Sequence, residues 1–449
     1  MNKVSICLVL LLSACSFAPD YERPNLDMPK SWGSKSNGSD IDQAEHLISL
    51  KWWRQFNDPR LIALLEEGLK SNLDLQLAIA KIQQLRAQYN STESGRAPTL
   101  NLSSHANRIS NSQESIMAGF PLSDKPYNDY NLSSVFNYEV DLWGRVSNNI
   151  ESAKAQLLSV LANRDAVYLT ILSDIAAGYF NLCALNEQIL VTEKTLASRT
   201  EALAYQEKQN RLGALDTLNL YQAEAEVSTT KVALENLRQS RVDQLNALGI
   251  LLGRTPRELV EQSVNTKEQL DDALETPRIP ENLPSTLLER RPDIYAAEQD
   301  LISSNALVGV ARADYFPTLS LSAIFGLSSS NLDKILRSSA RTWQLQSDLS
   351  GPIFDLSKPA KVDSALALKE QSIINYKKTV ITAFKEVITT KAAIDTTKNR
   401  LISLKKQVAS RKNATNILLK RYQVGYSTHL ELLDGERTLY TAEIDYITA

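Results

Sequence analysis

Long stretches without proline restrict most strongly what this chain of 449 residues can fold into. No proline occurs between Pro126 and Pro256, and none follows Pro359. Proline ends or kinks a helix, so its absence permits very long helices. Apolar residues recur at seven-residue spacing within these stretches, which indicates coiled-coil packing. The heptad series are Leu161, Tyr168, Ile175, Leu182, Ile189, Leu196 and Leu203; Leu220, Val227, Leu234 and Leu248, interrupted by Arg241; and Val380, Val387, Ile394, Leu401 and Val408.

The N-terminus predicts export from the cytoplasm. Lys3 and the apolar run Ile6–Leu12 precede Leu-Ser-Ala-Cys, which ends at Cys15 and looks like the lipobox of bacterial lipoproteins. We therefore expect residues 1–14 to be a signal peptide, and Cys15 to carry a diacylglycerol and an N-acyl lipid. An ordinary secretory signal containing a cysteine is the alternative. Ser16, in place of an aspartate, favours the outer membrane, and residues 15–50 are predicted to be an extended tether.

Four alternating segments predict strands. After the signal, no uninterrupted apolar stretch is long enough for a transmembrane helix, so any crossing must be made by strands. The apolar positions are Leu100, Leu102 and Ala106; Leu132, Phe136, Tyr138, Val140 and Leu142; Leu319, Leu321, Ala323, Phe325 and Leu327; and Trp343, Leu345, Leu349 and Ile353. Polar residues alternate with them, as in outer-membrane barrels. Half-buried strands of a soluble sheet would alternate in the same way.

The number of strands bears on assembly. Four strands cannot close a barrel, for which about eight are needed, and open edges are not tolerated in lipid. Membrane strands would therefore require several chains to share one barrel. By contrast, the predicted helix from Arg145 to Leu212 would be about 100 Å long. This is far longer than a bilayer is thick, so we expect the helix to project into the periplasm.

The sequence is internally duplicated. PTLNLS from Pro98 returns as PTLSLS from Pro317, and Asp141-Leu142 returns as Asp355-Leu356. Gly213, Leu218, Leu220 and Glu224 match Gly425, Leu430, Leu432 and Glu436. Each half therefore reads as helix, strand, loop, strand, long helix, turn and long helix, and we place the repeats at residues 51–270 and 271–449. The loops GFPLSDKPYNDY and GLSSSNLDKILRSSAR are expected to face the cell exterior.

Composition argues against several functions. The net charge of −3 comes from well-mixed charges and provides no basic face for nucleic acid. The three histidines, His46, His105 and His429, are not spaced for a metal, and no catalytic or nucleotide-binding motif occurs. After processing only Cys183 would remain free, so no internal disulfide can form. We expect neither an enzyme nor a metal or other cofactor, apart from the lipid on Cys15.

Four blocks carry a family resemblance. Residues 52–78 (WWRQFNDPRLIALLEEGLKSNLDLQLA), 136–146 (FNYEVDLWGRV), 283–323 (containing LLERRPDI and YFPTLSL) and 421–437 (RYQVGYSTHLELLDGER) resemble the TolC-like outer-membrane efflux family, in its NodT-type lipoprotein branch. The resemblance covers nearly the whole mature chain. It implies a membrane β-barrel joined to a long α-helical coiled-coil barrel: a homotrimer with twelve shared strands and a periplasmic helical tunnel. It also implies two partners, a periplasmic adaptor and an inner-membrane transporter, often of the resistance-nodulation-division type.

The resemblance also implies a periplasmic gate at the second helix turn, at Leu430, Asp434 and Arg437 with Tyr422 nearby. Three copies of Leu430 would make an apolar constriction and three of Asp434 a negative ring. Arg437 would pair with Asp434, three residues before it, or with a neighbouring chain. The alternative is that Asp434 and Arg437 are ordinary solvent-exposed charges on a helix surface and have no gating role.

Three positions depart from the family pattern. Gln423 replaces a basic residue often found there, and Pro359 follows the fourth strand where a Gly-rich turn is usual. The chain also ends about four helical turns before its own first repeat predicts, so we expect a shortened C-terminus. Together the observations predict a passive exit duct of a tripartite efflux system. The alternative is a non-conducting lipoprotein scaffold with periplasmic coiled coils. The exported substrate is not encoded in any motif.

Overall fold

The computed structural model describes residues 16–27, 52–110, 126–213, 216–261 and 291–449. The chain divides into two compact units. Unit 1 comprises Met1–Asp27, Ala80–Asn163 and Arg291–Thr379, and unit 2 comprises Met28–Ile79, Arg164–Arg290 and Val380–Ala449. Each unit therefore draws on both halves of the sequence, and the repeat boundaries at 51–270 and 271–449 stay predictions. The signal peptide, Cys15 and residues 28–51 of the chain lie outside the described residues.

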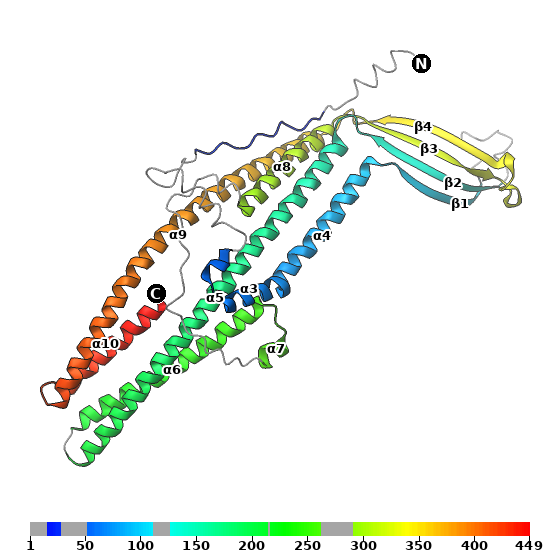
Figure 1. Ribbon diagram of the computed structural model, residues 1–449. Coiled ribbons are helices and arrows are strands. Elements are labelled where there is room, and N and C mark those ends of the chain that lie inside the picture. Colours follow the sequence, from blue (N-terminus) through cyan, green and yellow to red (C-terminus); the bar gives the residue numbers. More distant parts are fainter. Residues whose placement is uncertain (1–15, 28–51, 111–125, 214–215, 262–290) are drawn as a thin grey trace. The chain divides into compact units, whose positions relative to one another are not determined.

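The described residues of both halves share the order helix, strand, strand, long helix and second helix, as the internal duplication predicts (Figure 1). The first half contains a 3₁₀ turn (Trp52–Phe56), α3 (Pro59–Ser71), α4 (Leu73–Glu93), β1 (Thr99–Ile109), β2 (Tyr127–Val140), α5 (Arg145–Arg211), α6 (Thr217–Leu251) and α7 (Pro256–Glu261). The second half contains α8 (Pro292–Ala313), β3 (Thr318–Ser329), β4 (Arg341–Ser350), α9 (Ser357–Gln423) and α10 (His429–Thr448). As predicted from the proline-free stretches, α5 and α9 are very long, at 67 residues each.

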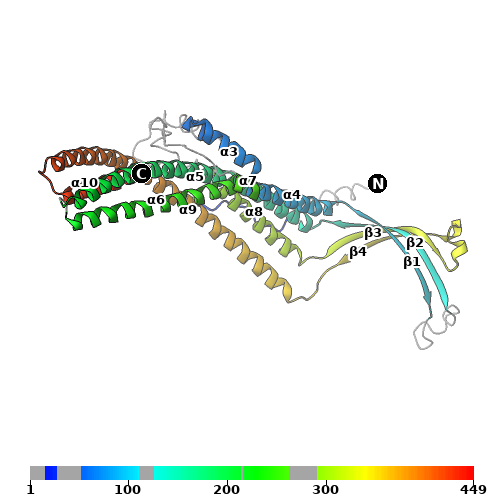
Figure 2. The same cartoon turned by 90° about the horizontal axis from the view of Figure 1, so that it is seen from below.

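The four strands of unit 1 form one antiparallel sheet in the order β1-β2-β3-β4, drawn side by side in Figure 2. Pro98 and Pro317 immediately precede β1 and β3. Proline ends the helical pattern, and the alternation of leucine with polar residues begins the strand. The repeated hexapeptide therefore marks each entry into the sheet, as the duplication predicted.

Several predicted strand and loop ends were wrong by a few residues. Leu142 and Ile353 lie beyond the ends of β2 and β4. Residues 127–130 of the first predicted outer loop are strand, and so are residues 326–329 and Arg341 of the second. Hydrogen bonding across the sheet extends the strands because Tyr130 pairs with Ser329 and Tyr127 pairs with Ile109. Residues 111–125, which include most of the first loop, lie outside the described residues.

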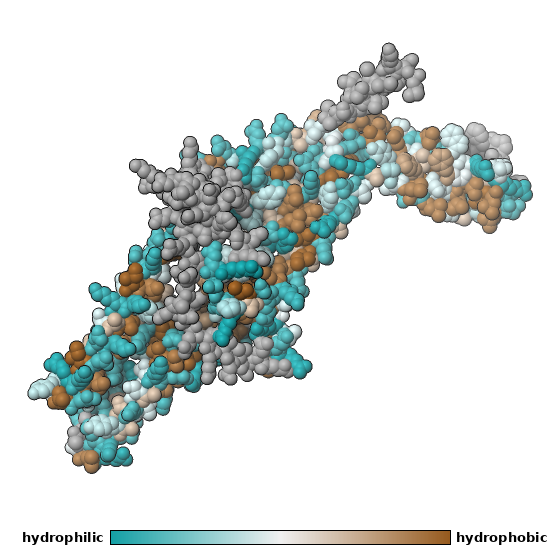
Figure 3. Space-filling model, in the orientation of Figure 1, coloured by the Kyte–Doolittle hydropathy of each residue, from teal (hydrophilic) through white to brown (hydrophobic). Residues whose placement is uncertain are grey.

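The register gives the sheet two faces. Leu100, Phe136, Ala323 and Leu345 follow one another across the four strands, and so do Thr99, Asn137, Ser322 and Gln346. The apolar row is solvent-exposed in the single chain, with Leu100 at 73% and Leu345 at 66%, and apolar residues gather over the strands in Figure 3. In the polar row Ser322 Oγ donates to Asn137 Oδ1 at 2.9 Å. Alternation of this kind suits a wall with lipid on one side and water on the other.

Duplicated aspartates begin the two long helices. Asp141 accepts hydrogen bonds from the backbone N–H groups of Val146 and Ser147 at 3.0 and 2.8 Å, and Asp355 accepts from that of Ser357 at 2.9 Å. Free N–H groups at a helix start require such acceptors. The repeated aspartate therefore caps the long helix that follows β2 and the one that follows β4, at the same end of the sheet.

Unit 2 has an apolar core around the middle of α5. Its fully buried members include Leu61 and Leu65 of α3, Leu172, Ile175 and Leu182 of α5, and Leu252 after α6. By length and composition alone, α5 also contains an 18-residue window apolar enough to cross a membrane, of which 44% is buried. This qualifies the reading that no such stretch follows the signal. Because Leu172, Ile175 and Leu182 pack in this core, we read the window as a core-forming segment.

Candidate functional site

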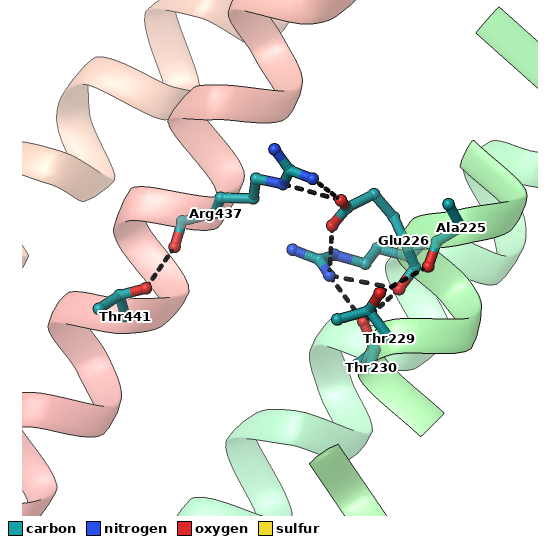
Figure 4. Close-up of polar contacts among 7 residues, drawn as sticks. Ala225, Glu226, Thr229, Thr230, Arg437 and Thr441 are labelled. Atoms are coloured by element: carbon teal, nitrogen blue, oxygen red, sulfur yellow. Dashed lines mark hydrogen bonds and ion pairs between the residues drawn. The ribbon is translucent and has the colours of Figure 1, made fainter. Parts of the chain in front are cut away.

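A buried carboxylate in unit 2 joins three helices. Glu226 of α6 is 4% exposed. One of its carboxylate oxygens lies 2.8 Å from Arg199 Nη1 of α5, and the other accepts from Arg437 Nε of α10 at 2.7 Å and also from Arg437 Nη2. Figure 4 shows Arg437 reaching across to Glu226. A single carboxylate therefore holds α5, α6 and α10 together through two guanidinium groups.

The remaining contacts of Arg199 explain how an ion pair is accommodated in this interior. Arg199 is 7% exposed. Its Nη1 donates to Thr230 Oγ1 at 2.6 Å, and its guanidinium lies 6.0 Å from the centre of the Tyr440 ring. A buried charge is costly unless it is paired and hydrogen-bonded. The Nη1 of Arg199 meets both conditions, whereas its buried Nε has no hydrogen-bond partner among the described residues. The Arg437 side chain is 57% exposed, so this arm of the cluster is open to solvent.

The position of Arg437 corrects one prediction. Within the chain we expected Arg437 to pair with Asp434, and that was wrong: its partner is Glu226. Pairing with a neighbouring chain stays a prediction. The hydrogen bond to Glu226 raises the pKa of the Arg437 guanidinium, with Asp434 making a smaller contribution. Asp434 is exposed, and Leu430 is 59% exposed. Both of these side chains are therefore available to contact other molecules.

Tyr422, the fourth predicted gate residue, lies beside the turn between α9 and α10. Its ring centre is 5.8 Å from that of His429, the first residue of α10. Gln206 Nε2 of α5 lies 3.1 and 3.2 Å from the two ring nitrogens of His429. Burial lowers the pKa of His429 and raises that of Tyr422. These contacts join α9 and α10 to α5.

The α9–α10 turn itself is tightly specified. Gly425 has φ of 80°, a left-handed conformation that suits glycine, and Gly213 has φ of 71° in the matching first-half turn. Thr428 and Glu431 form a reciprocal capping box at the start of α10. Hydrogen bonds from Ser427 and from the Thr428 backbone lower the pKa of Glu431. The turn therefore holds Leu430, Asp434 and Arg437 on a well-defined first part of α10.

The sequence pointed to Arg437 on α10, but not to Arg199 on α5 or Glu226 on α6. Arg199 and Glu226 belong to no recognisable motif. Glu226 lies beside Val227 of the second heptad series, and a charged residue at such a position is expected to face solvent. Only the three-dimensional packing shows that it is buried. Throughout the described parts of the chain, no group of three or more His, Cys, Asp or Glu side chains is placed to hold a metal ion.

The sheet has one apolar and one polar face, as membrane strands do, and it continues into very long helices that polar contacts hold together. These features define the class of protein as an outer-membrane channel subunit. Comparison with known proteins gives the family. The family model described as "Outer membrane efflux protein" matches residues 64–254 and 283–449. The chain belongs to this family of outer-membrane efflux channels.

Individual relatives agree with this assignment. "Cation efflux system protein CusC" from Escherichia coli K12 is 30% identical over 435 residues, covering 97% of this chain and 92% of that protein. "Toluene efflux pump outer membrane protein TtgI" from Pseudomonas putida is 32% identical over 441 residues, with the same coverage. The crystal structure of the Campylobacter jejuni CmeC outer membrane channel superposes with a TM-score of 0.88 at 25% identity, covering 97% of this chain and 91% of that one.

Proposed function

We propose that three copies of this chain form one exit duct, with a shared twelve-stranded barrel in the outer membrane and a helical tunnel in the periplasm. The observation that carries this proposal is the sheet order β1-β2-β3-β4, which leaves β1 and β4 as its two edges. Unpaired edges are not tolerated in lipid, and four strands are too few to close. Pairing of β4 with β1 of the next copy satisfies both edges, and three copies follow from the family resemblance.

Lipidation at Cys15 is part of the proposal. A diacylglycerol and an N-acyl chain on Cys15 would anchor each copy to the outer membrane independently of its strands. Ser16, the next residue, is the first that the structure describes. Stable anchoring requires two membrane signals such as two acyl chains, and the three chains proposed on Cys15 would meet this requirement without the barrel.

The proposed partners are a periplasmic adaptor and an inner-membrane transporter, the latter of the resistance-nodulation-division type. CusC is named for cation efflux and TtgI for toluene efflux, so related ducts serve chemically different solutes. We therefore assign substrate selection to the transporter. The duct supplies a water-filled passage lined by the polar row of the sheet, and energy is spent at the inner membrane.

The gate of this duct is proposed at the start of α10. Three copies of Leu430 would form an apolar constriction, three of Asp434 a negatively charged ring, and Tyr422 would pack behind them. The closed state would be held by Arg437 on Glu226, because that contact fastens α10 to α6. The Arg437 arm is half-exposed, so a docking partner could reach it and separate the pair, whereas the Arg199 arm is buried.

Conductance of the purified protein in planar bilayers tests the duct and its gate. Arg437→Ala and Asp434→Ala are expected to raise the conductance of a channel that is nearly closed in the unmodified protein. Arg238→Ala is the matched control, because Arg238 makes exposed ion pairs with Glu193 and Glu235 on α5 and α6. Heat-labile migration as a trimer is expected for all of these proteins. A monomer that carbonate releases from membranes, with no channel activity in any variant, would instead support the lipoprotein scaffold.

A further inference from the structure

The segment that follows Cys15 docks along α8. We call residues Ser16 to Arg23 the strap; Figure 1 draws it as a dark blue trace. Three side chains of α8 contact it at seven-residue spacing. Arg312 Nη1 donates to the Phe17 carbonyl at 3.3 Å, Asn305 Nδ2 donates to the Pro19 carbonyl at 2.8 Å, and Glu298 accepts from Tyr21 Oη and Arg23 Nη2, each at 3.0 Å.

The lengths of the two segments match. The strap runs antiparallel to α8, since its later residues meet earlier residues of the helix. From Phe17 to Arg23 an extended chain covers about 20 Å. From Glu298 to Arg312 the helix rises about 21 Å. An extended strap therefore stays in register with one stripe of α8 along its whole length, which an incidental contact would not do.

A glycine makes room for this approach. Gly309 lies on α8 between Asn305 and Arg312, and a Cβ atom placed there would lie 2.8 Å from both Cβ and N of Ala18 and 2.5 Å from Asn148 Nδ2. Asn148 of α5 in turn accepts a hydrogen bond from Ser16 Oγ at 3.0 Å. Glycine weakens a helix interior, so its presence here is explained by the close packing of the strap.

One end of the strap is fixed where the strands meet the helices. The Phe17 ring stacks on Phe316 with centres 4.5 Å apart and lies 6.2 Å from that of Trp143. Phe316 lies two residues before the start of β3, and Trp143 follows β2. Trp143 Nε1 also donates to the Pro317 carbonyl at 2.7 Å. The aromatic cluster therefore connects the strap to the base of the two central strands.

The other end of the strap connects α8 with α9. Arg23 Nε donates to the hydroxyl of Tyr376 at 3.1 Å, while Arg23 Nη2 pairs with Glu298. Tyr376 is only 4% exposed. Burial and the hydrogen bond to Glu298 raise the pKa of Tyr21, so its hydroxyl stays protonated and donates to that carboxylate.

We propose that the strap is an assembly clamp: once docked along α8, it fixes the predicted lipid anchor at the base of the strands and braces the sheet for membrane insertion. Ser16 is joined directly to Cys15, so a docked strap brings the acylated residue to the strand ends within about one residue length. Cleavage before Cys15 would then release the strap from the signal peptide and permit docking. The anchor role depends on the proposed lipidation, whereas the docking does not.

Gly309→Ala tests the clamp. Alanine favours helix more than glycine does, so without a docked strap this substitution should leave α8 intact and require only that the flexible Asn148 amide of α5, 2.5 Å from the new Cβ, move aside. With the strap docked, the added methyl group collides with Ala18. We expect a severalfold loss of heat-labile trimer in outer-membrane fractions, with unchanged palmitate labelling. Gly178→Ala in α5 is the matched control, because a Cβ there meets only the flexible end of Gln244 at 3.0 Å and Leu248 at 3.5 Å.

A cross-link tests docking independently of function. Arg23→Lys keeps a positive charge opposite Glu298, so a zero-length carbodiimide should join the new amine to the Glu298 carboxylate, which lies 3.0 Å from Arg23 Nη2. Tryptic peptides joined by this amide bond would establish docking even if the protein were neither lipidated nor trimeric. Absence of the link, or wild-type assembly of Gly309→Ala, would overturn the clamp. Loss of trimer in the unmodified protein would count against the proposed duct and leave the cross-link result standing.

Discussion

Glu226 is the single residue on which the joining of α5, α6 and α10 most depends. Glu226→Gln would leave Arg199 as a buried, uncompensated charge and release Arg437. Breaking one partner of a buried pair is strongly destabilising, so we expect the free energy of unfolding to fall by about 3 kcal/mol. Denaturant unfolding of the detergent-solubilised protein, followed by circular dichroism, measures this change.

Glu193→Gln provides the comparison for that prediction. Glu193 pairs with Arg238 at 3.0 Å, and both side chains are about half exposed, at 47% and 50%. Exposed ion pairs contribute at most about 1 kcal/mol, so this variant should unfold close to the unmodified protein. Equal effects of the two substitutions would show that Glu226 does not act as a buried partner.

Glu436 makes stability depend on pH. Burial raises the pKa of this carboxyl above its usual value. The folded state then binds the proton more readily than the unfolded state, so its contribution to stability is most favourable in acid and is lost as pH rises through about 4.5 and the folded pKa. Glu436→Gln should therefore raise the melting temperature at pH 8, and the gain should shrink as pH approaches 4. A gain that is constant across pH would contradict this assignment.

The limits of sequence reasoning at the residue scale follow from distance along the chain. The resemblance in residues 421–437 singled out Leu430, Asp434, Arg437 and Tyr422, because the turn and its cap are local features. It could not identify Glu226 as the partner of Arg437, because Glu226 lies in the other half of the chain. Asp434, three residues away in the sequence, was therefore predicted as the partner. The gate role of these residues stays a prediction.

At the scale of elements, comparing two glycines with nearly the same φ angle distinguishes the cost of a strained backbone conformation from the cost of a steric clash. Gly253 follows α6 with φ of 70°, and a Cβ there would lie 2.0 Å from the carbonyl oxygen of Ser71 at the end of α3. Gly213 has φ of 71°, and apart from its chain neighbours no atom of the described residues lies within 4 Å of its Cβ position. Gly213→Ala should cost about 1–2 kcal/mol for the left-handed conformation alone.

Gly253→Ala should cost at least about 1 kcal/mol more, because backbone must also move where α3 meets α6. Asn72 Nδ2 donates to the Leu251 carbonyl at 2.7 Å in this junction, so its displacement would also break a long-range hydrogen bond. Unfolding midpoints of the two variants, measured under identical conditions, give the difference. Similar losses in both would show that the α3–α6 junction relaxes without cost.

The bounds of an element were predictable where the sequence is periodic. They were less certain where pairing with a neighbouring strand determines the conformation. The heptad pattern and the absence of proline predicted the C-terminal end of α5 to within one residue. Pro98 and Pro317 correctly predicted where β1 and β3 begin. The start of β2 was missed because Asn128 and Asp129 are poor strand formers. Their strand conformation comes from β1, where Asp129 pairs with Asn107 and its carboxylate lies 3.3 Å from His105.

At the scale of the whole molecule, the two unpaired strands determine how copies must join. If β4 of one copy pairs with β1 of the next, their polar-face residues come within disulfide range across the new contact, since directly opposed Cβ atoms lie about 4.5–5.5 Å apart. Asn101→Cys in β1 can be combined in turn with Gln344→Cys, Gln346→Cys and Asp348→Cys in β4. We expect one of these pairs, set by the register between copies, to give a ladder ending at a covalently closed trimer on non-reducing gels.

Leu102→Cys in β1 serves as the control for this scan. Leu102 belongs to the opposite, apolar face of the sheet, so it should not link to any of the three polar-face positions even in the correct register. Each subunit contributes one β1 and one β4, so a closed ring of three requires every edge to be used once. A ladder that stops at dimer would indicate a two-chain barrel of eight strands, and monomer alone in every combination would contradict a shared barrel.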